Sequence, residues 1–269
     1  MAEFRCSEVA NTLKLDCRIY GTGHNGFGQI ELNGKPKISK PIALEECITK
    51  HSINQIYATW RYTVLVRDTS LLLQGSLEPS GQHQYKTIEL PYSIKKLCVS
   101  HDHILVGLTI DNILVLSKDL SSVFTKHTSS QKFEDFWRTH ESMLVQESNK
   151  YYSILKLRGT TISSIHIPLK IVTAVSQVVC GHSHTVILTA DTSVYVYGNG
   201  ARGELGLGDL EGRREPVQLE ALGGLRVIQL SSGGWHNLAL TESGDVYSWG
   251  WNESCQLGLE SLIQVKLCN

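Results

Sequence analysis

Apolar and polar residues alternate in short runs along this chain, and small or turn-forming residues separate the runs. In the clearest run, His236 and Leu238 fall on one face of an extended segment and Asn237 on the other. The next residues, Glu242–Asp245, are typical of a tight turn, because Gly244 can take a positive φ. An apolar run returns directly afterwards. The pattern therefore predicts a β-hairpin.

This hairpin belongs to the second copy of a longer repeat. Residues 180–209 and 232–260 align without a gap at an offset of 52 residues. Further strands are expected at Val227–Ser232 and, as an outer strand, at Pro216–Leu222. About four strands in a unit that recurs at this interval are typical of a β-propeller blade. The sequence thus predicts an all-β fold.

Three weaker hairpins are expected before the repeat, at 57–76, 97–117 and 140–159. The segment that follows Ile19 resembles the tail of a unit and predicts a partial one. The only helix candidate is Phe133–Met143, for which an outer strand with its loop is the alternative. Each of the five hairpins is assigned one anchor residue, and these anchors are Tyr62, His103, His140, His184 and His236.

Composition narrows the class of protein. Lys and Arg number 25 against 26 Asp and Glu, so the chain has no overall charge bias toward nucleic acid or a membrane surface. The N-terminus has no apolar segment typical of a secretory signal, and no run is long enough to span a membrane. The seven cysteines form no CxxC pair. These features indicate an intracellular protein with reduced, mostly buried thiols.

The repeat resembles a known family. Its pattern, G-x-x-H-[TN]-x-x-L-T followed by [VL]-Y-x-[WY]-G and x-L-G-L, is similar to the regulator of chromosome condensation (RCC-type) β-propeller repeat, most clearly over 178–260. The resemblance implies a seven-bladed ring. Since about five hairpins and one partial unit are found, we expect an incomplete, C-terminally truncated ring with unpaired strand edges. The expected division is an N-terminal segment 1–18, repeats over 19–260 and a divergent tail 261–269.

Two motifs are typical of cofactor or metal sites. Residues 21–26 and 198–203 both match G-x-G-x-x-G, but no helix is expected after either, so we interpret them as turn glycines and expect no cofactor. His182 and His184 are two residues apart, as are His101 and His103, which puts each pair on one face of a strand. The repeat keeps only the second histidine, so a half-buried structural role is the preferred interpretation and no metal is expected.

Candidate partner-binding residues come from positions where the two copies differ. Trp235 stands where the first copy has Ser183, and Trp251 stands where it has Asn199. Turns on a rigid scaffold carry binding residues, and tryptophan and arginine contribute most to interfaces, although packing between blades is the alternative for both tryptophans. Trp60 is noted without a role, and Trp249 is interpreted as packing. Arg202, Arg213 and Arg214 complete the candidate set, and His184, Gly198, Gly203, Gly206, His236, Gly250 and Gly258 are expected to be structural.

No nucleophile, phosphate-loop or paired-carboxylate motif is found, so no catalytic residue is expected. The family resemblance implies a non-catalytic scaffold bound to chromatin through a histone or a jumonji-type histone demethylase, in the nucleus and secondarily in the cytoplasm. The alternative that it implies is guanine-nucleotide exchange on a small Ras-like GTPase, for which we find no inserted β-wedge. A nucleotide-binding oxidoreductase is a third class and requires helices after the glycine motifs. Direct contact with nucleic acid or a membrane is not expected.

Overall fold

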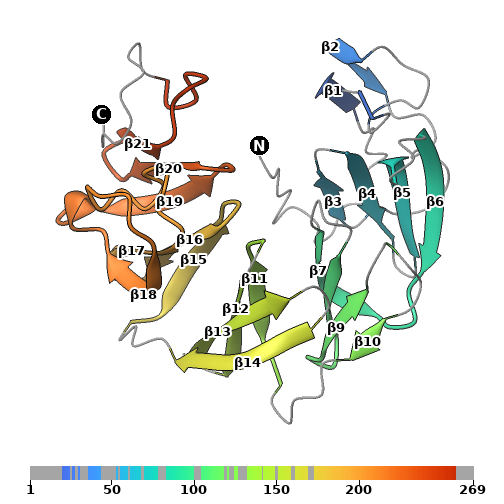
Figure 1. Cartoon of the computed structure of the whole chain (residues 1–269), viewed down its shortest axis with the longest axis horizontal. Helices are drawn as coiled ribbons and strands as arrows, with labels where there is room; N and C mark the ends of the chain where they lie inside the picture. Colours follow the sequence, from blue (N-terminus) through green and yellow to red (C-terminus); the bar gives the residue numbers. More distant parts are fainter. Residues whose placement is uncertain are drawn as a thin grey trace. The chain divides into compact units, whose positions relative to one another are not determined.

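The computed structural model contains two compact units, residues 3–129 and residues 130–269, and each is built from antiparallel β-sheets (Figure 1). It describes residues 20–24, 26–27, 30, 36–43, 53, 55–59, 61–67, 70–77, 83–99, 104–117, 120, 124–126, 132–140, 142–148, 151–158, 161–168 and 173–258. Among these residues no helix is long and apolar enough to cross a bilayer. The predicted segments 1–18 and 261–269 lie outside them, so the domain division stays a prediction.

The first unit contains one two-stranded sheet and two four-stranded sheets. The two-stranded sheet pairs β1 with β2 and coincides with the predicted partial repeat. The other sheets follow the orders β3–β4–β5–β6 and β7–β8–β9–β10. The strands are β1 Tyr20–His24, β2 Lys37–Ala43, β3 Gln55–Ala58, β4 Tyr62–Val66, β5 Ser70–Ser76, β6 His83–Glu89, β7 Ile94–Val99, β8 Leu105–Thr109, β9 Leu114–Ser117 and β10 Thr125–Lys126.

The second unit contains two four-stranded sheets and one three-stranded sheet, β11–β14, β15–β18 and β19–β21, again with consecutive strands paired. Its elements are β11 Asp135–Arg138, β12 Ser142–Ser148, β13 Tyr151–Arg158, β14 Thr161–Pro168, β15 Val175–Cys180, β16 His184–Thr189, β17 Val194–Gly198, β18 Arg213–Gln218, the 3-10 turn η2 Glu220–Leu222, β19 Val227–Ser232, β20 His236–Thr241 and β21 Val246–Gly250. The five predicted hairpins are therefore confirmed, as the second and third strands of five blade-like sheets.

Burial follows from the stacking of one sheet on the next. Every residue of β16 is buried, because both faces of this strand are covered. Val186 and Val196 pack with Ala239 and Trp249 of the following sheet in one apolar cluster. The side-chain amide of Gln177 joins the same two sheets, since it donates to the Leu230 carbonyl at 2.9 Å and accepts from the Leu230 N–H at 2.8 Å.

Two expectations about single elements are corrected. The segment Phe133–Met143 is not a helix; β11 and the start of β12 occupy it, and burial alternates with the period of two that a strand requires. The outer strand of the first repeat is β18, which begins at Arg213 and ends at Gln218. The chain turns there because Leu219 and Leu222 are both buried and the Leu222 N–H binds the Leu219 carbonyl.

Three of the sheets have the same turn between their second and third strands, and this turn shows which residues of the repeats correspond. Thr109, Thr189 and Thr241 each donate a backbone N–H to the carbonyl four residues later, at 2.9–3.0 Å. The third residue after each threonine takes a positive φ, 63° at Asn112, 67° at Thr192 and 92° at Gly244. These are positions where a left-handed residue closes the turn.

This register moves two of the predicted anchors. His184 and His236 each lie five residues before the turn threonine of their sheet. In the earlier sheet the residue at this position is Ile104 and not His103, which lies outside the described residues. In the sheet β11–β14 the equivalent residue is Ser142, because Thr139 N–H binds its carbonyl as Gly181 N–H binds that of His184. His140 therefore corresponds to His182, and its assignment as the repeat anchor is wrong.

The described cysteines are free thiols. Cys180 is buried, Cys98 is half-buried and Cys255 is exposed. The expectation of mostly buried thiols therefore holds for Cys180 and not for Cys255. Cys255 also has φ 57°, where the first copy has Gly203 at φ 75°.

Candidate protein-interaction site

A buried polar network joins the two clearest repeats beneath the candidate site. His184 is fully buried, and its Nε2 atom lies 2.8 Å from Oδ1 of Asn237 in the next sheet. Ser232 Oγ donates to the same oxygen at 2.8 Å. The Asn237 amide donates at 2.8 Å to the Glu204 carbonyl, which also accepts the indole N–H of Trp249 at 3.1 Å. Each repeat thus contributes polar groups that satisfy groups of the other.

The network keeps His184 uncharged. Desolvation by burial lowers the pKa of His184 to about 4, against a partial rise from its hydrogen bond with Asn237. The neutral ring carries its hydrogen on Nε2, because the partner is an amide oxygen. Gly181 packs against the ring so closely that any added Cβ would overlap it. The sequence predicted a half-buried histidine, whereas His184 is fully buried and its partner is a side chain of the next sheet.

Backbone hydrogen bonds connect the loops that precede the second strands of three successive sheets. His140 N–H donates to the His182 carbonyl at 2.8 Å, and His182 N–H donates to the Gly234 carbonyl at 2.8 Å. The rings follow the same order, since the His140 and His182 centroids are 5.2 Å apart and those of His182 and Trp235 are 5.3 Å apart. The ladder therefore lines up side chains that are about 40–50 positions apart in the sequence.

Trp235, Trp251 and Arg202 form a compact cluster at the end of this row, which we call the Trp–Arg cluster. The two indoles meet edge to face with centroids 5.4 Å apart. The Arg202 guanidinium lies 4.4 Å from the Trp235 ring and 5.6 Å from the Trp251 ring. Both tryptophans are half-buried and Arg202 is exposed. Three residues predicted separately from the sequence are thus in contact.

Backbone hydrogen bonds determine where the residues of the Trp–Arg cluster lie. Trp251 N–H donates to the Trp235 carbonyl at 2.8 Å, as Asn199 N–H donates to the Ser183 carbonyl in the first copy. Gly250 and Gly198 make these approaches possible, with φ 106° and 115° and with the facing backbone where a Cβ would stand. Arg202 is held from below, because its backbone N–H donates at 2.6 Å to the buried carboxylate of Glu204.

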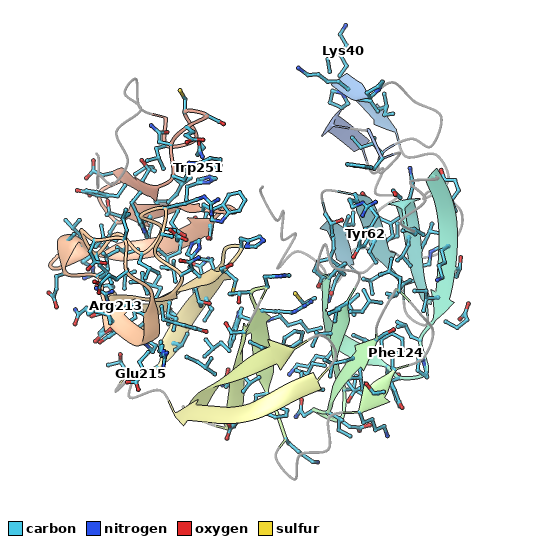
Figure 2. All side chains as sticks on the ribbon, in the orientation of Figure 1. Lys40, Tyr62, Phe124, Arg213, Glu215 and Trp251 are labelled. Atoms are coloured by element: carbon cyan, nitrogen blue, oxygen red, sulfur yellow. The ribbon has the colours of Figure 1, made fainter. Side chains whose placement is uncertain are left out.

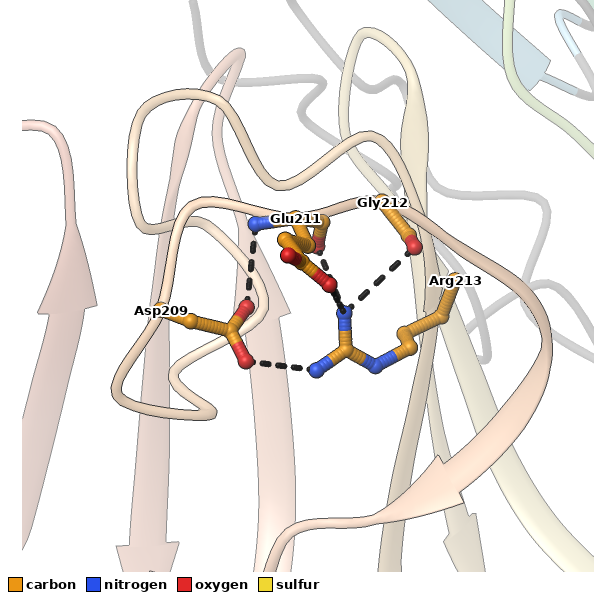
Figure 3. A network of polar contacts seen from close by, with 4 residues as sticks. All are labelled: Asp209, Glu211, Gly212 and Arg213. Carbon is orange, nitrogen blue, oxygen red and sulfur yellow. Dashed lines mark hydrogen bonds and ion pairs between the residues drawn. The ribbon is translucent and has the colours of Figure 1, made fainter.

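The other two arginines lie elsewhere in the same unit. Arg213 binds the Asp209 carboxylate at 2.6 Å and the carbonyl oxygens of Glu211 and Gly212 (Figure 3). It is well separated from Trp251 (Figure 2). Arg214 is exposed on β18. The candidate set is therefore divided, with one arginine beside the tryptophans and one engaged by acidic residues of its own loop.

The remaining candidates have different outcomes. Trp249 has no exposed surface and packs in the core as expected. Trp60, His101 and His103 lie outside the described residues. His182 and His184 do not converge, because the first contacts aromatic rings and the second is in the buried network. In the described part of the chain no three His, Cys, Asp or Glu side chains are grouped as a metal site.

The glycine motifs have the geometry of turns. The motif 198–203 is followed by turns and then by β18, with no helix between the motif and this strand. Gly203, Gly206 and Gly258 take φ of 75°, 68° and 72°, in the left-handed region that favours glycine. In the motif 21–26, Asn25 lies outside the described residues and the rest includes the end of β1. A nucleotide site of the kind that requires a following helix is absent from 198–203.

Sequence reasoning missed Glu204, Asn237 and His182. Asn237 and Glu204 look like ordinary polar residues of a strand and a loop, and only the stacking of the sheets buries them. His182 was set aside as the unrepeated member of a pair. The sequence would have shown this if His140 had been aligned with His182 and not with His184. That alignment places His140, His182 and Trp235 at neighbouring positions of successive repeats.

Comparison with family models places this geometry in context. The regulator of chromosome condensation (RCC1) repeat matches residues 191–240, and a second model of the same repeat matches 175–204 and 227–256. These residues are RCC1 repeats. The matched region contains the Trp–Arg cluster and the buried network beneath it.

Curated proteins match the RCC1 repeats of this chain over a limited stretch. RCC1 domain-containing protein 1 of Mus musculus is 49% identical over 85 residues, which are 32% of this chain and 22% of that protein. The Homo sapiens protein of the same name is 47% identical over 83 residues, 31% of this chain and 22% of its own length. The chain therefore matches about a fifth of the length of these relatives.

Solved structures show the fold more widely. Yeast RCC1 (Prp20), in a structure with Kap60, has a TM-score of 0.74 at 14% identity, covering 95% of this chain and 71% of that one. Human WBSCR16 has a TM-score of 0.70 at 15% identity, covering 91% and 74%. The chain thus has the all-β propeller fold of RCC1 repeats, as the sequence repeat predicted.

Proposed function

We propose that this chain is a non-catalytic protein–protein interaction scaffold whose partner binds at the Trp–Arg cluster. The observation that carries the proposal is the exposed Arg202 guanidinium stacked on Trp235 and Trp251. Arginine and tryptophan are the residues that most often dominate binding energy at interfaces. Glu204 of the buried network holds the Arg202 backbone, and a backbone hydrogen bond joins Trp251 to Trp235, so less conformational entropy is lost on binding.

The partner that we favour is a chromatin protein, either a histone or a jumonji-type histone demethylase, and the location is the nucleus with the cytoplasm as a second site. The family resemblance supports this choice. A structure of Prp20p from Saccharomyces cerevisiae, with a TM-score of 0.72 at 14% identity, is described together with its binding to Gsp1p and histones. That likeness transfers the fold, and the partner is our proposal.

The test is affinity capture from nuclear extract with the wild-type chain and two variants. Trp235→Ala removes half of the indole pair, whereas Ile228→Ala shortens an apolar side chain that is 53% exposed on β19, away from the Trp–Arg cluster. We expect the wild type and Ile228→Ala to retain the same histone or demethylase and Trp235→Ala to lose it. Equal recovery by all three proteins contradicts the proposed site.

Guanine-nucleotide exchange on a small Ras-like GTPase is the alternative function. It is tested with the same purified chain by following the release of a fluorescent GDP analogue from a panel of Ras-like GTPases. Acceleration of release that requires the chain supports the alternative and argues against a purely non-catalytic scaffold.

A further inference from the structure

We infer that the Trp–Arg cluster recognises an acidic peptide segment of its partner, with one carboxylate held by Arg202. This inference rests on the proposed function and specifies the chemistry of the partner. It follows from a difference among the arginines of the two repeats, from the hydrogen-bonding groups of the cluster and from the spacing of its rings.

The arginines of this region differ in what neutralises them. Arg213 is paired with Asp209 at 2.6 Å, and Arg226 is paired with Glu242 at 2.9 Å. Among the described residues the Arg202 guanidinium forms no ion pair. It makes cation–π contacts with the faces of the two indole rings. Stacking on a ring face leaves the edge of the guanidinium, with its N–H groups, available to a carboxylate in the bidentate geometry.

The neighbouring groups also favour an acceptor. The indole N–H groups of Trp235 and Trp251 donate to no atom of the described residues, and each is a donor only. The carboxylate of Glu204, in the same loop, is fully buried and accepts the Arg202 backbone N–H. A partner cation, such as a methylated lysine, would instead meet Arg202 already stacked on the ring faces that it needs.

The row of rings sets the length of the segment. His140, His182, Trp235 and Trp251 follow one another at centroid distances of 5.2–5.4 Å. An extended peptide advances about 3.3 Å per residue, so about five residues cover this row. An acidic residue at the Arg202 end, followed by apolar residues over the rings, fits the surface best.

The binding test uses labelled peptides of defined charge. A fluorescein-labelled ten-residue peptide has one glutamate followed by four apolar residues, and neutral polar residues elsewhere. It is compared with the same peptide carrying glutamine, and with one carrying trimethyl-lysine, in place of the glutamate. Fluorescence anisotropy at low and high salt gives the affinities. We expect the glutamate peptide to bind at least tenfold more tightly than the others and to weaken as salt screens the charges.

Variants of the chain locate the binding. Arg202→Gln is expected to lose about tenfold in affinity for the glutamate peptide, Arg202→Lys to lose less because it keeps the charge without the planar fork, and Arg226→Gln to bind as the wild type does. The urea midpoints of the variants show that they are folded. Equal binding of the glutamate and glutamine peptides, preference for trimethyl-lysine, or unchanged binding by Arg202→Gln overturns the inference. If the nuclear partner still requires Trp235 in such a case, the scaffold function stands and only the acidic specificity is wrong.

Discussion

The imidazole of His184 and the side-chain amide of Asn237 meet at 2.8 Å between two successive RCC1 repeats, and neither group is exposed to solvent. The pair lies beneath the Trp–Arg cluster, because Asn237 also binds the carbonyl of Glu204, whose carboxylate holds the Arg202 backbone. The stability of the repeat junction and the geometry of the surface therefore depend on the same few polar groups.

Replacing Asn237 with alanine is expected to destabilise the chain by about 2–3 kcal/mol, because it removes the buried hydrogen bonds that the amide makes with His184 Nε2, Ser232 Oγ and the Glu204 carbonyl. Urea unfolding measures the change. Asn199→Ala is the control, since this asparagine is exposed and its side-chain oxygen accepts the Ala201 N–H at 3.0 Å. The idea of a buried junction is wrong if both variants lose the same small amount.

Acid is expected to weaken the fold through His184. Desolvation by burial lowers its pKa from 6.5 to about 4, so the unfolded chain binds a proton more readily than the folded chain between these values. The contribution is complete above about pH 6.5 and is lost as the pH falls toward 4. Urea unfolding at pH 7 and at pH 5 measures the effect. The contribution of His184 should make the free energy of unfolding about 2 kcal/mol lower at pH 5.

The variant His184→Gln isolates this effect, because glutamine keeps an N–H for Asn237 and does not titrate. Its stability should change less between pH 7 and pH 5 than that of the wild type. Some slope should remain, since desolvation also lowers the pKa of His236. Identical slopes for wild type and variant would mean that His184 is already solvated in the folded chain.

Gly181→Ala is expected to cost about 2–3 kcal/mol, because the new methyl group overlaps the His184 ring and lies 2.8 Å from the Gly233 carbonyl oxygen. The matched change is Gly208→Ala, at φ 85° with no atom within 4 Å, where only the backbone conformation opposes alanine. That control should cost about 1 kcal/mol. Thermal and urea unfolding of the two variants distinguish crowding from backbone strain.

Arg213→Gln should change stability by less than about 1 kcal/mol, because its ion pair with Asp209 is partly exposed. The local effect should still be visible. The hydrogen bond from Arg213 is the main cause of the lowered pKa of Asp209, so in the variant this pKa should move up toward its ordinary value. An NMR titration of the Asp209 carboxyl measures it, and an unchanged pKa would show that the loop pairing is not formed in solution.

The strands could be predicted from the sequence because the alternation, the turn residues and the repeat all specify the same hairpins. Gly244 closes its turn as expected, and β19 has the predicted bounds Val227–Ser232. The helix candidate failed because the aromatic residues around Phe136 fit both periods over so short a run. Only pairing with β12 decides between them.

The site was less accessible to sequence reasoning. Trp235 and Trp251 could be selected because they vary in a constant frame, and Arg202 because it is a loop arginine. Their contact depends on a backbone bond between two loops. Glu204 and His184 are buried by the next sheet, and burial by a neighbouring blade leaves no mark on the local pattern. The anchor at His140 was misplaced for a related reason, since register within a sheet is set by pairing and not by residue type.

The backbone bond from Trp251 to Trp235 has the same form as the bond from Asn199 to Ser183. One fold thus presents a polar couple in one repeat and an aromatic couple in the next, and the same main-chain bond joins the members of each couple. Substitution of two residues per repeat can therefore change the side chains at this surface, while the strands and the core remain as they are. A gene that duplicates such a unit gains a new place to evolve recognition without having to build a new scaffold.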